Sequence, residues 1–223
     1  MEDMVSGNCE VMDKYDPKKK VALVVDEWGG WYEVEPGTND AFLYQQSTMR
    51  DAMIAGLTLN IFDNHCDRVR MANLAQCINV LQSVILTNGP KMVLTPTYHV
   101  MEMYNVHQDA LMIPLTITSN DFTDGENKLK AISASASKDK NGLVHISLVN
   151  IDADNAQDIN VDLGSLQAKT VTGRILRSDK LQDHNTFDDP NKIKPQTFTD
   201  TKLNDGKLEV TLPPFSVVVL ELK

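Results

Sequence analysis

The run Val21–Val25 constrains the fold more than any other segment, because its five apolar residues follow one another without alternation. Such runs are typical of parallel strands that are buried on both faces of a sheet. The run leads directly into Asp26 and Glu27. A carboxylate at the buried end of a strand is costly to desolvate, so its presence there indicates that the chain uses it. We therefore expect a functional site at the carboxyl end of this strand.

The first half of the chain has the order of elements expected of an α/β fold. We predict helices over Met4–Asp16, Gln45–His65 and Pro96–Val106, and a second strand over Val69–Ala75. In a (β/α)8 barrel, or TIM barrel, of roughly 250 residues, the carboxyl ends of the parallel strands form the active-site face. Residues 1–108 have room for about two or three of its strand–helix units. We interpret them as the C-terminal part of such a barrel.

The second half has a different pattern, in which short apolar-rich segments recur, and apolar and polar residues alternate in Leu129–Ser137 and Leu143–Asn150. Turn-forming residues separate the segments, which are Leu129–Ser137, Leu143–Asn150, Asp158–Leu163, Val171–Leu176, Lys207–Leu212 and Phe215–Lys223. Several short strands at this spacing predict an antiparallel β-sandwich. We place the domain boundary near residue 109, so that residues 109–223 form the sandwich.

Charge and hydropathy argue against two classes of partner. The formal net charge is −10 and the pI is about 4.9, whereas nucleic-acid binding usually needs a clustered basic face. No apolar run approaches the roughly 18 residues that span a bilayer. The N-terminal segment is polar and acidic, unlike a signal peptide. We expect a soluble protein with no nucleic-acid or membrane partner, either cytoplasmic or exported as part of a longer chain.

The residue types that bind metals do not form a ligand pattern. The three cysteines are odd in number and lack CxxC spacing, so we expect buried free thiols rather than a disulfide framework or a zinc site. His65 lies near two aspartates, and His99 and His107 lie in one predicted helical stretch. We assign these histidines to packing or solvent exposure. The residues themselves thus predict no metal site.

Aromatic residues follow the two carboxylates and point to a sugar ligand. Trp28, Trp31 and Tyr32 offer flat rings, on which the C–H faces of a sugar pack. Glycoside hydrolysis commonly uses two carboxylates, one of which attacks the anomeric carbon in retaining enzymes. The position of Glu27 alone does not assign its role. The alternative is that Asp26 and Glu27 cap a loop or pair with an arginine.

Several long segments resemble one family of enzymes. VALVVDEWGGWY is followed by FLYQQSTMRDAMIAGLTLNIFDNHCDRVRMANLAQCINVLQS and TPTYHVMEMYNVHQ, and later by LQDHNTFDDPNKIKP and LPPFSVVVLEL. From about Met12 to Lys223, the chain resembles the C-terminal portion of the α-L-arabinofuranosidases of glycoside hydrolase family 51. Ordered segments of this length are far more specific than the DEW triplet alone.

The resemblance implies a fold, an activity and site residues. Members of the family are retaining hydrolases with a barrel and a C-terminal sandwich. They act on arabinan, arabinoxylan and related oligosaccharides without a cofactor, and they often form homo-oligomers. Their nucleophile corresponds to Glu27, a tryptophan that shapes the pocket to Trp31, and a glutamine that binds arabinose to Gln76. From the residues alone, a helix cap or a solvent-facing amide is the simpler interpretation of Gln76.

The second carboxylate of the family has no counterpart in this sequence. Family members carry their general acid/base in an Asn-Glu motif on an earlier barrel strand, and the chain has no Asn followed directly by Glu. Glu126-Asn127 has the reverse order. We therefore expect the chain to hold the nucleophile half of an arabinofuranosidase site. Two alternatives remain, a non-catalytic carbohydrate-binding or assembly module built on residues 109–223, and a fragment without activity.

Overall fold

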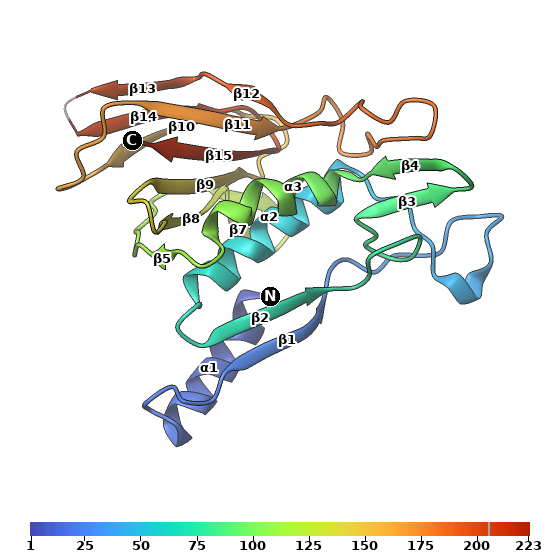
Figure 1. Ribbon diagram of the computed structural model, residues 1–223, viewed down its shortest axis with the longest axis horizontal. Coiled ribbons are helices and arrows are strands. Elements are labelled where there is room, and N and C mark those ends of the chain that lie inside the picture. The colour runs from blue at the N-terminus through green and yellow to red at the C-terminus, as the bar shows by residue number, and fades with distance from the viewer. Residues whose placement is uncertain (205) are drawn as a thin grey trace.

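The fold has three tiers, which we describe from a computed structural model for all residues except residue 205. A β-sandwich is uppermost, two helices cover its lower face, and a two-stranded ribbon with a further helix lies below them (Figure 1). These lower elements are α1 (Glu2–Tyr15), β1 (Leu23–Trp28), α2 (Met49–Asn64), β2 (Val69–Leu74) and α3 (Pro96–Tyr104).

The sandwich consists of a six-stranded and a three-stranded sheet, in which every pairing is antiparallel. This confirms the antiparallel pairing predicted from the alternation. In order across the sheets, the larger consists of β12 (Gln196–Phe198), β11 (Val171–Leu176), β15 (Ser216–Leu222), β9 (Val144–Asn150), β8 (Ile132–Lys138) and β5 (Leu111–Met112), and the smaller of β10 (Gln157–Asp162), β14 (Lys207–Leu212) and β13 (Thr201–Asn204).

Alternation along the strands decides which side chains reach the core of the sandwich. In β14, Leu208, Val210 and Leu212 are buried and the residues between them are exposed. Strand β15 differs, because it is buried on both faces: Val218 belongs to the core between the sheets, and Val217 to the cluster that includes the helices. This explains the unbroken apolar run 217–220 within it.

Helix α2 lies very close to the larger sheet. A Cβ at Gly56 would come within 3.0 Å of Val149 Cγ2 and 3.3 Å of Val217 Cγ2. The absence of a side chain therefore permits this approach of helix and sheet. The apolar cluster formed there joins α2 and α3 to the sandwich, so residues on both sides of position 109 share one core. The domain boundary itself stays a prediction.

The ribbon below the helices contains the two predicted parallel strands. Trp28 of β1 is paired with Leu74 of β2. The expectation that the run Val21–Val25 is buried on both faces is wrong, since Val21 is 60% and Val24 is 43% exposed. Among residues 1–204 and 206–223 these are the only parallel strands longer than an isolated bridge, and they form no closed barrel. One face of the ribbon consequently has no covering layer.

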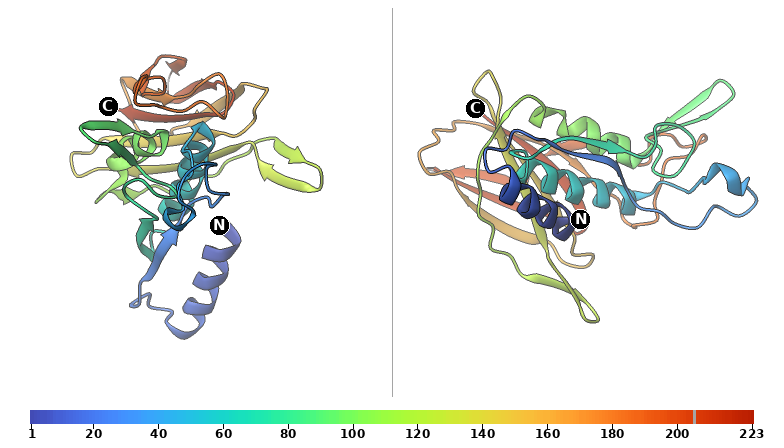
Figure 2. Two further views of the ribbon diagram at one scale, coloured as in Figure 1. Left: turned by 90° about the vertical axis from the view of Figure 1, so that its right-hand side faces the viewer. Right: turned by 90° about the horizontal axis from the view of Figure 1, so that it is seen from below.

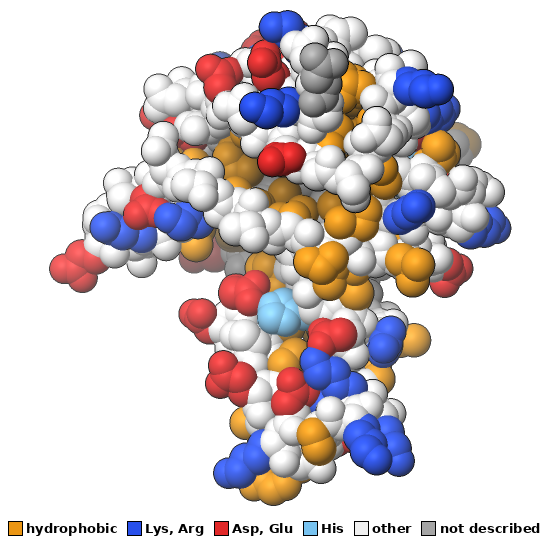
Figure 3. Space-filling view, turned by 90° about the vertical axis from the view of Figure 1, so that its left-hand side faces the viewer, with side chains coloured by type: hydrophobic (Ala, Val, Ile, Leu, Met, Phe, Trp, Pro, Cys, Tyr) orange, Lys and Arg blue, Asp and Glu red, His pale blue; other side chains and the backbone are white. Residues whose placement is uncertain are grey.

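Charged side chains fasten α1 to the ribbon. The guanidinium of Arg68, whose side chain is fully buried, donates to Asp13 and, at 2.9 Å, to Asp16 Oδ2. His65 Nε2 lies 2.7 Å from Glu2 Oε1. In Figure 3 this lower tier is a narrow stalk on which acidic and basic side chains lie side by side.

Two hairpins that the sequence patterns did not predict project from the body (Figure 2). The Asn-Gly-Pro sequence around Gly89, which predicts a break in the chain, forms the turn of the first. Gly89 and Gly125 supply the positive φ of the two turns, at 56° and 59°. The hairpins are β3 (Ile85–Asn88) with β4 (Lys91–Leu94) and β6 (Asp121–Asp124) with β7 (Asn127–Lys130), and the short helices are η1 (Asp40–Phe42) and η2 (Asn105–His107).

Candidate active site

Glu27 and Gln76 lie at the same end of the β1–β2 ribbon. Glu27 precedes Trp28, the partner of Leu74, and Trp28 O accepts a hydrogen bond from Ala75 N at 3.2 Å. Gln76 follows directly, and both predicted site residues are exposed. The parallel pairing therefore brings the carboxylate of Glu27 and the amide of Gln76 to the same exposed end of the ribbon.

The carboxylate of Glu27 forms no ion pair within the described part of the chain. Arg68 pairs with aspartates at the end of α1. Arg50 pairs with Asp51 at 3.1 Å, and its guanidinium carbon lies 3.5 Å from the centroid of the Tyr32 ring. Since neither arginine is a partner of Glu27, its carboxylate is free to meet a ligand.

Two glycines set the path of the chain after Glu27. Gly29 has a φ of 136°, and a Cβ there would lie only 2.4 Å from Gln82 Cγ. Only glycine fits such a position without displacing its neighbours. The loop then exposes Trp31, which is 67% exposed. Its ring is thus open to solvent on the loop that follows Glu27.

Trp28 is unavailable to a ligand, which corrects the expectation that it contributes a ring to the site. It is 4% exposed, and its ring meets that of Phe62 edge-on, with 5.7 Å between the centroids. A register shift between Val25 and Trp28 interrupts the alternation of the strand. Trp28 therefore packs in the same cluster as Leu23 and Val25, whereas Glu27 is exposed. Tyr32 lies under the guanidinium of Arg50. Trp31 is therefore the aromatic residue of this segment that a sugar can reach.

Three buried polar residues hold this loop, and the sequence analysis missed them. Gly30 O accepts hydrogen bonds from Gln45 Nε2 at 3.0 Å and from Gln82 Nε2 at 2.6 Å. Gln82 Nε2 also donates to Asp51 Oδ1 at 3.1 Å. Because Gln82 lies in the segment that follows Gln76, the network joins the loops that leave β1 and β2. The one signal was Gln82, which interrupts the apolar segment VLQSVIL, whereas Gln45 and Asp51 gave none.

A second polar cluster lies between the other end of α2 and the sandwich. Burial raises the pKa of Asp63 to about 6, against the effect of a hydrogen bond from Ser135 Oγ at 3.1 Å. Burial and the neighbouring His145 lower the pKa of His107 to about 4. Both ring nitrogens of His107 lie within 2.7 Å of serine hydroxyls. These groups belong to the packing of helix on sheet, and we assign them no catalytic role.

The residues that the structure describes contain no cluster of three or more histidine, cysteine or carboxylate side chains suited to a metal ion. The three cysteines are unpaired; Cys9 is buried, but Cys77 is exposed, contrary to expectation. No described helix combines the length and the apolar character needed to cross a membrane.

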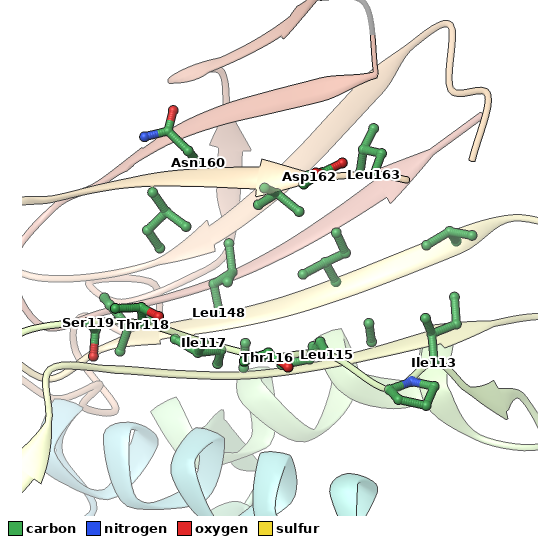
Figure 4. Close-up of a pocket in the computed structure, with 18 of the residues that line it drawn as sticks. Ile113, Leu115, Thr116, Ile117, Thr118, Ser119, Leu148, Asn160, Asp162 and Leu163 are labelled. Carbon is green, nitrogen blue, oxygen red and sulfur yellow. The ribbon is translucent and has the colours of Figure 1, made fainter. Parts of the chain in front are cut away.

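A cavity of about 1050 Å³ lies between the two sheets of the sandwich (Figure 4). Its walls are β8, β9 and β10 and the extended segment 113–120, from which Ile113, Leu115 and Ile117 contribute aliphatic side chains. None of its lining residues is aromatic, so it lacks the flat rings on which sugars pack. The cavity gives no support to a carbohydrate-binding module built on residues 109–223.

The sequence profile of the α-L-arabinofuranosidase C-terminal domain matches residues 26–216. The chain belongs to this arabinofuranosidase family. The domain is similar to an intracellular exo-α-L-arabinofuranosidase of Bacteroides ovatus, with 50% identity over 224 residues, or 100% of this chain and 44% of that enzyme. An exo-α-(1→6)-L-arabinofuranosidase of Bifidobacterium longum is 25% identical over 222 residues, which cover 92% of this chain and 42% of that enzyme.

A solved structure extends the similarity to three dimensions. The arabinofuranosidase domain superposes on the crystal structure of the family 51 arabinofuranosidase from Xanthomonas axonopodis pv. citri with a TM-score of 0.98 and 44% identity, over 100% of this chain and 45% of that one. The resemblance inferred from the sequence is confirmed. The chain spans less than half the length of these relatives. The roles of Glu27, Trp31 and Gln76 stay predictions.

Proposed function

We propose that this chain is the nucleophile-bearing part of a retaining exo-α-L-arabinofuranosidase. The observation that carries the proposal is the parallel pairing of β1 with β2, because it puts Glu27 and Gln76 at the same exposed end of the ribbon. Family membership and the exo-acting relatives support the choice of substrate. The substrate is a terminal α-L-arabinofuranosyl residue on an arabinan- or arabinoxylan-type chain or oligosaccharide.

In the proposed reaction, a carboxylate oxygen of Glu27 attacks the anomeric carbon of that residue. The bond from this carbon to the leaving oxygen breaks, and a covalent glycosyl-enzyme forms. Water then attacks the same carbon, and arabinose leaves with its original anomeric configuration. The ring of Trp31 packs on the C–H face of the sugar, and the amide of Gln76 binds a sugar hydroxyl.

Complete turnover needs a second carboxylate. In retaining enzymes it protonates the leaving oxygen, later activates the water, and lies roughly 5–5.5 Å from the nucleophile. We assign this role to no residue of the chain, because the sequence lacks the Asn-Glu motif. The proposed contribution of this chain is the nucleophile and part of the sugar site.

A dinitrophenyl α-L-arabinofuranoside tests the nucleophile without the acid, because dinitrophenolate leaves unprotonated. The second step lacks its base, so the adduct should accumulate. We expect intact-mass spectrometry to find one arabinosyl unit on the wild-type chain and none on Glu27→Gln. The neighbouring substitution Asp26→Asn is the matched control and should leave labelling in place. An unlabelled wild-type chain, or labelling of Glu27→Gln at the wild-type rate, would contradict the proposal.

A further inference from the structure

We infer that Gln45 and Gln82 are positioning residues that fix the backbone of Trp31 and so place its ring for the sugar at Glu27. The inference rests on the proposed function, because Trp31 has this role only where Glu27 meets an arabinosyl unit. Both glutamines are 2% exposed, so they act on the sugar through Trp31 and not by contact.

The position of the Trp31 ring depends on its backbone. At 67% exposure, the residue has too few neighbours for packing alone to hold it. The two residues before it are Gly29 and Gly30, and glycine has more conformational freedom to lose on folding than any other residue. Hydrogen bonds to its backbone must therefore fix the conformation of this loop.

One buried amide holds the peptide groups on both sides of Trp31. Gln45 Nε2 donates to Gly30 O at 3.0 Å, and Gln45 Oε1 accepts from Tyr32 N at 2.9 Å. The side chain thus pairs with the backbone as a neighbouring strand would. If an apolar side chain replaced this amide, Gly30 O and Tyr32 N would each lose one hydrogen-bond partner.

Gln82 ties the same loop to the rest of the protein. Its Nε2 donates to Gly30 O at 2.6 Å and to Asp51 Oδ1 at 3.1 Å. Asp51 is fully buried, and its other oxygen accepts from Thr48 N at 2.8 Å, at the start of α2. Gln82 and Gln76 lie in the same loop. The loops that carry Trp31 and Gln76, the two proposed sugar-binding residues, are therefore both linked to the start of α2.

Methionine is close to glutamine in shape but cannot pair with these groups. Misplacement of a substrate-binding group by about 1 Å can cost about 100-fold in rate. We therefore expect labelling by the dinitrophenyl arabinofuranoside to slow by about 10- to 100-fold in Gln45→Met and in Gln82→Met. The control is Val210→Ala, a core substitution in β14 that lowers stability away from the loop and should leave the labelling rate unchanged.

Fluorine NMR supplies a readout that a loss of global stability would not produce. The chain has two tryptophans, Trp28 and Trp31, so incorporation of 5-fluorotryptophan should give two resonances. Trp31→Phe assigns them. In both methionine variants, we expect the Trp31 resonance to move toward its position in the unfolded chain and the Trp28 resonance to stay. Val210→Ala should move neither.

The outcomes separate this inference from the proposed function. An unlabelled wild-type chain would overturn the proposed function, and with it the role given to Trp31. Labelling of Gln45→Met and Gln82→Met at the wild-type rate would overturn the inference alone. The inference would also fail if both tryptophan resonances moved together, or if Val210→Ala slowed labelling equally, because loss of global stability would then explain the effect.

Discussion

Trp28 and Leu74 are partners in the parallel ladder of β1 and β2, and this pair sets the positions of Glu27 and Gln76. Glu27 comes directly before the pair and Gln76 shortly after it, so both reach the same edge. Trp28 itself points inward and meets Phe62 of α2. Trp28 therefore packs the ribbon against α2, and the candidate nucleophile Glu27 is the residue next to it on the strand.

Replacement of Gln76 tests its proposed contact with the sugar. Gln76 is exposed, so Gln76→Ala should leave the thermal midpoint unchanged. Loss of one hydrogen bond to the sugar, worth about 1 kcal/mol, should slow labelling of Glu27 by about fivefold or more. Asn73→Ala, an exposed residue of β2, is the matched control. Equal labelling rates in the two variants would remove Gln76 from the site.

Asn185 holds the long loop between β11 and β12 in place through hydrogen bonds to the backbone. Its side-chain amide donates to Leu94 O at 2.9 Å and to Ile193 O at 2.8 Å, and accepts from Ile193 N at 2.7 Å. Asn185→Ala should lower the free energy of unfolding by about 3 kcal/mol, measured by urea denaturation. His184→Ala should cost much less, because the His184 ring bonds the carbonyl of Gln182, two residues away in the same loop. Similar losses in the two variants would refute this role.

Two partly buried groups predict opposite pH dependences of stability. The pKa of His107 falls from 6.5 to about 4 on folding. Its contribution to the free energy of unfolding is therefore complete above pH 6.5 and is lost as the pH falls through about 4. The pKa of Asp63 rises from 3.8 to about 6, so its contribution is present below pH 3.8 and is lost as the pH rises through about 6. Each is worth at most about 3 kcal/mol.

Two variants separate these contributions in urea denaturation across pH 4–7. Relative to wild type, His107→Gln should gain stability as the pH falls, because it removes the cost of protonating a partly buried ring. Asp63→Asn should gain stability as the pH rises, because it removes the cost of ionising a partly buried carboxyl group. Differences from wild type that do not change with pH would contradict both assignments.

The close approach of α2 to the sheet predicts opposite results for two glycine substitutions. Gly56→Ala should lose stability despite the better helix propensity of alanine, because overpacking typically costs about 1–3 kcal/mol and the propensity gain is only about 1 kcal/mol. Gly7→Ala in α1, where a Cβ meets nothing within 4 Å, should gain about 0.5–1 kcal/mol. Thermal denaturation measures both. A gain at Gly56 would show that the helix can move away from the sheet.

Sequence patterns predicted many of the elements, but not all of them. The apolar run at Val21–Val25 and the segment at Val69–Ala75 predicted the parallel pair, and short apolar-rich segments predicted six strands of the sandwich. The short strands β5, β12 and β13 and the two hairpins were not predicted, because segments this short have no clear pattern. An apolar run does not show whether a layer covers each face of the sheet. Here one face of the ribbon is uncovered, and Val24 is exposed on it. The burial of Trp28 did not follow from the pattern, because strict alternation would put it on the face of Val24, and the register shift between Val25 and Trp28 breaks that alternation.

The residues that support the loop after Glu27 had no periodic signal. Gln45, Asp51 and Gln82 come from three separate segments, and they meet only through the backbone of one loop and the first turn of α2. Their burial depends on hydrogen bonds across the fold, which no local pattern encodes. The resemblance to a family identified the residues proposed to meet the sugar, and the structure was needed to find those that hold them.

The most direct test of the central claim is to locate the arabinosyl label within the chain. Cleavage after Lys20 and Arg50 releases the peptide 21–50, which contains Glu27 together with Asp26, Glu33, Glu35 and Asp40. After reaction with the dinitrophenyl arabinofuranoside, tandem mass spectrometry of this peptide should place the arabinosyl group on Glu27. A label on any other carboxylate, or in another peptide, would contradict the assignment of Glu27 as the nucleophile.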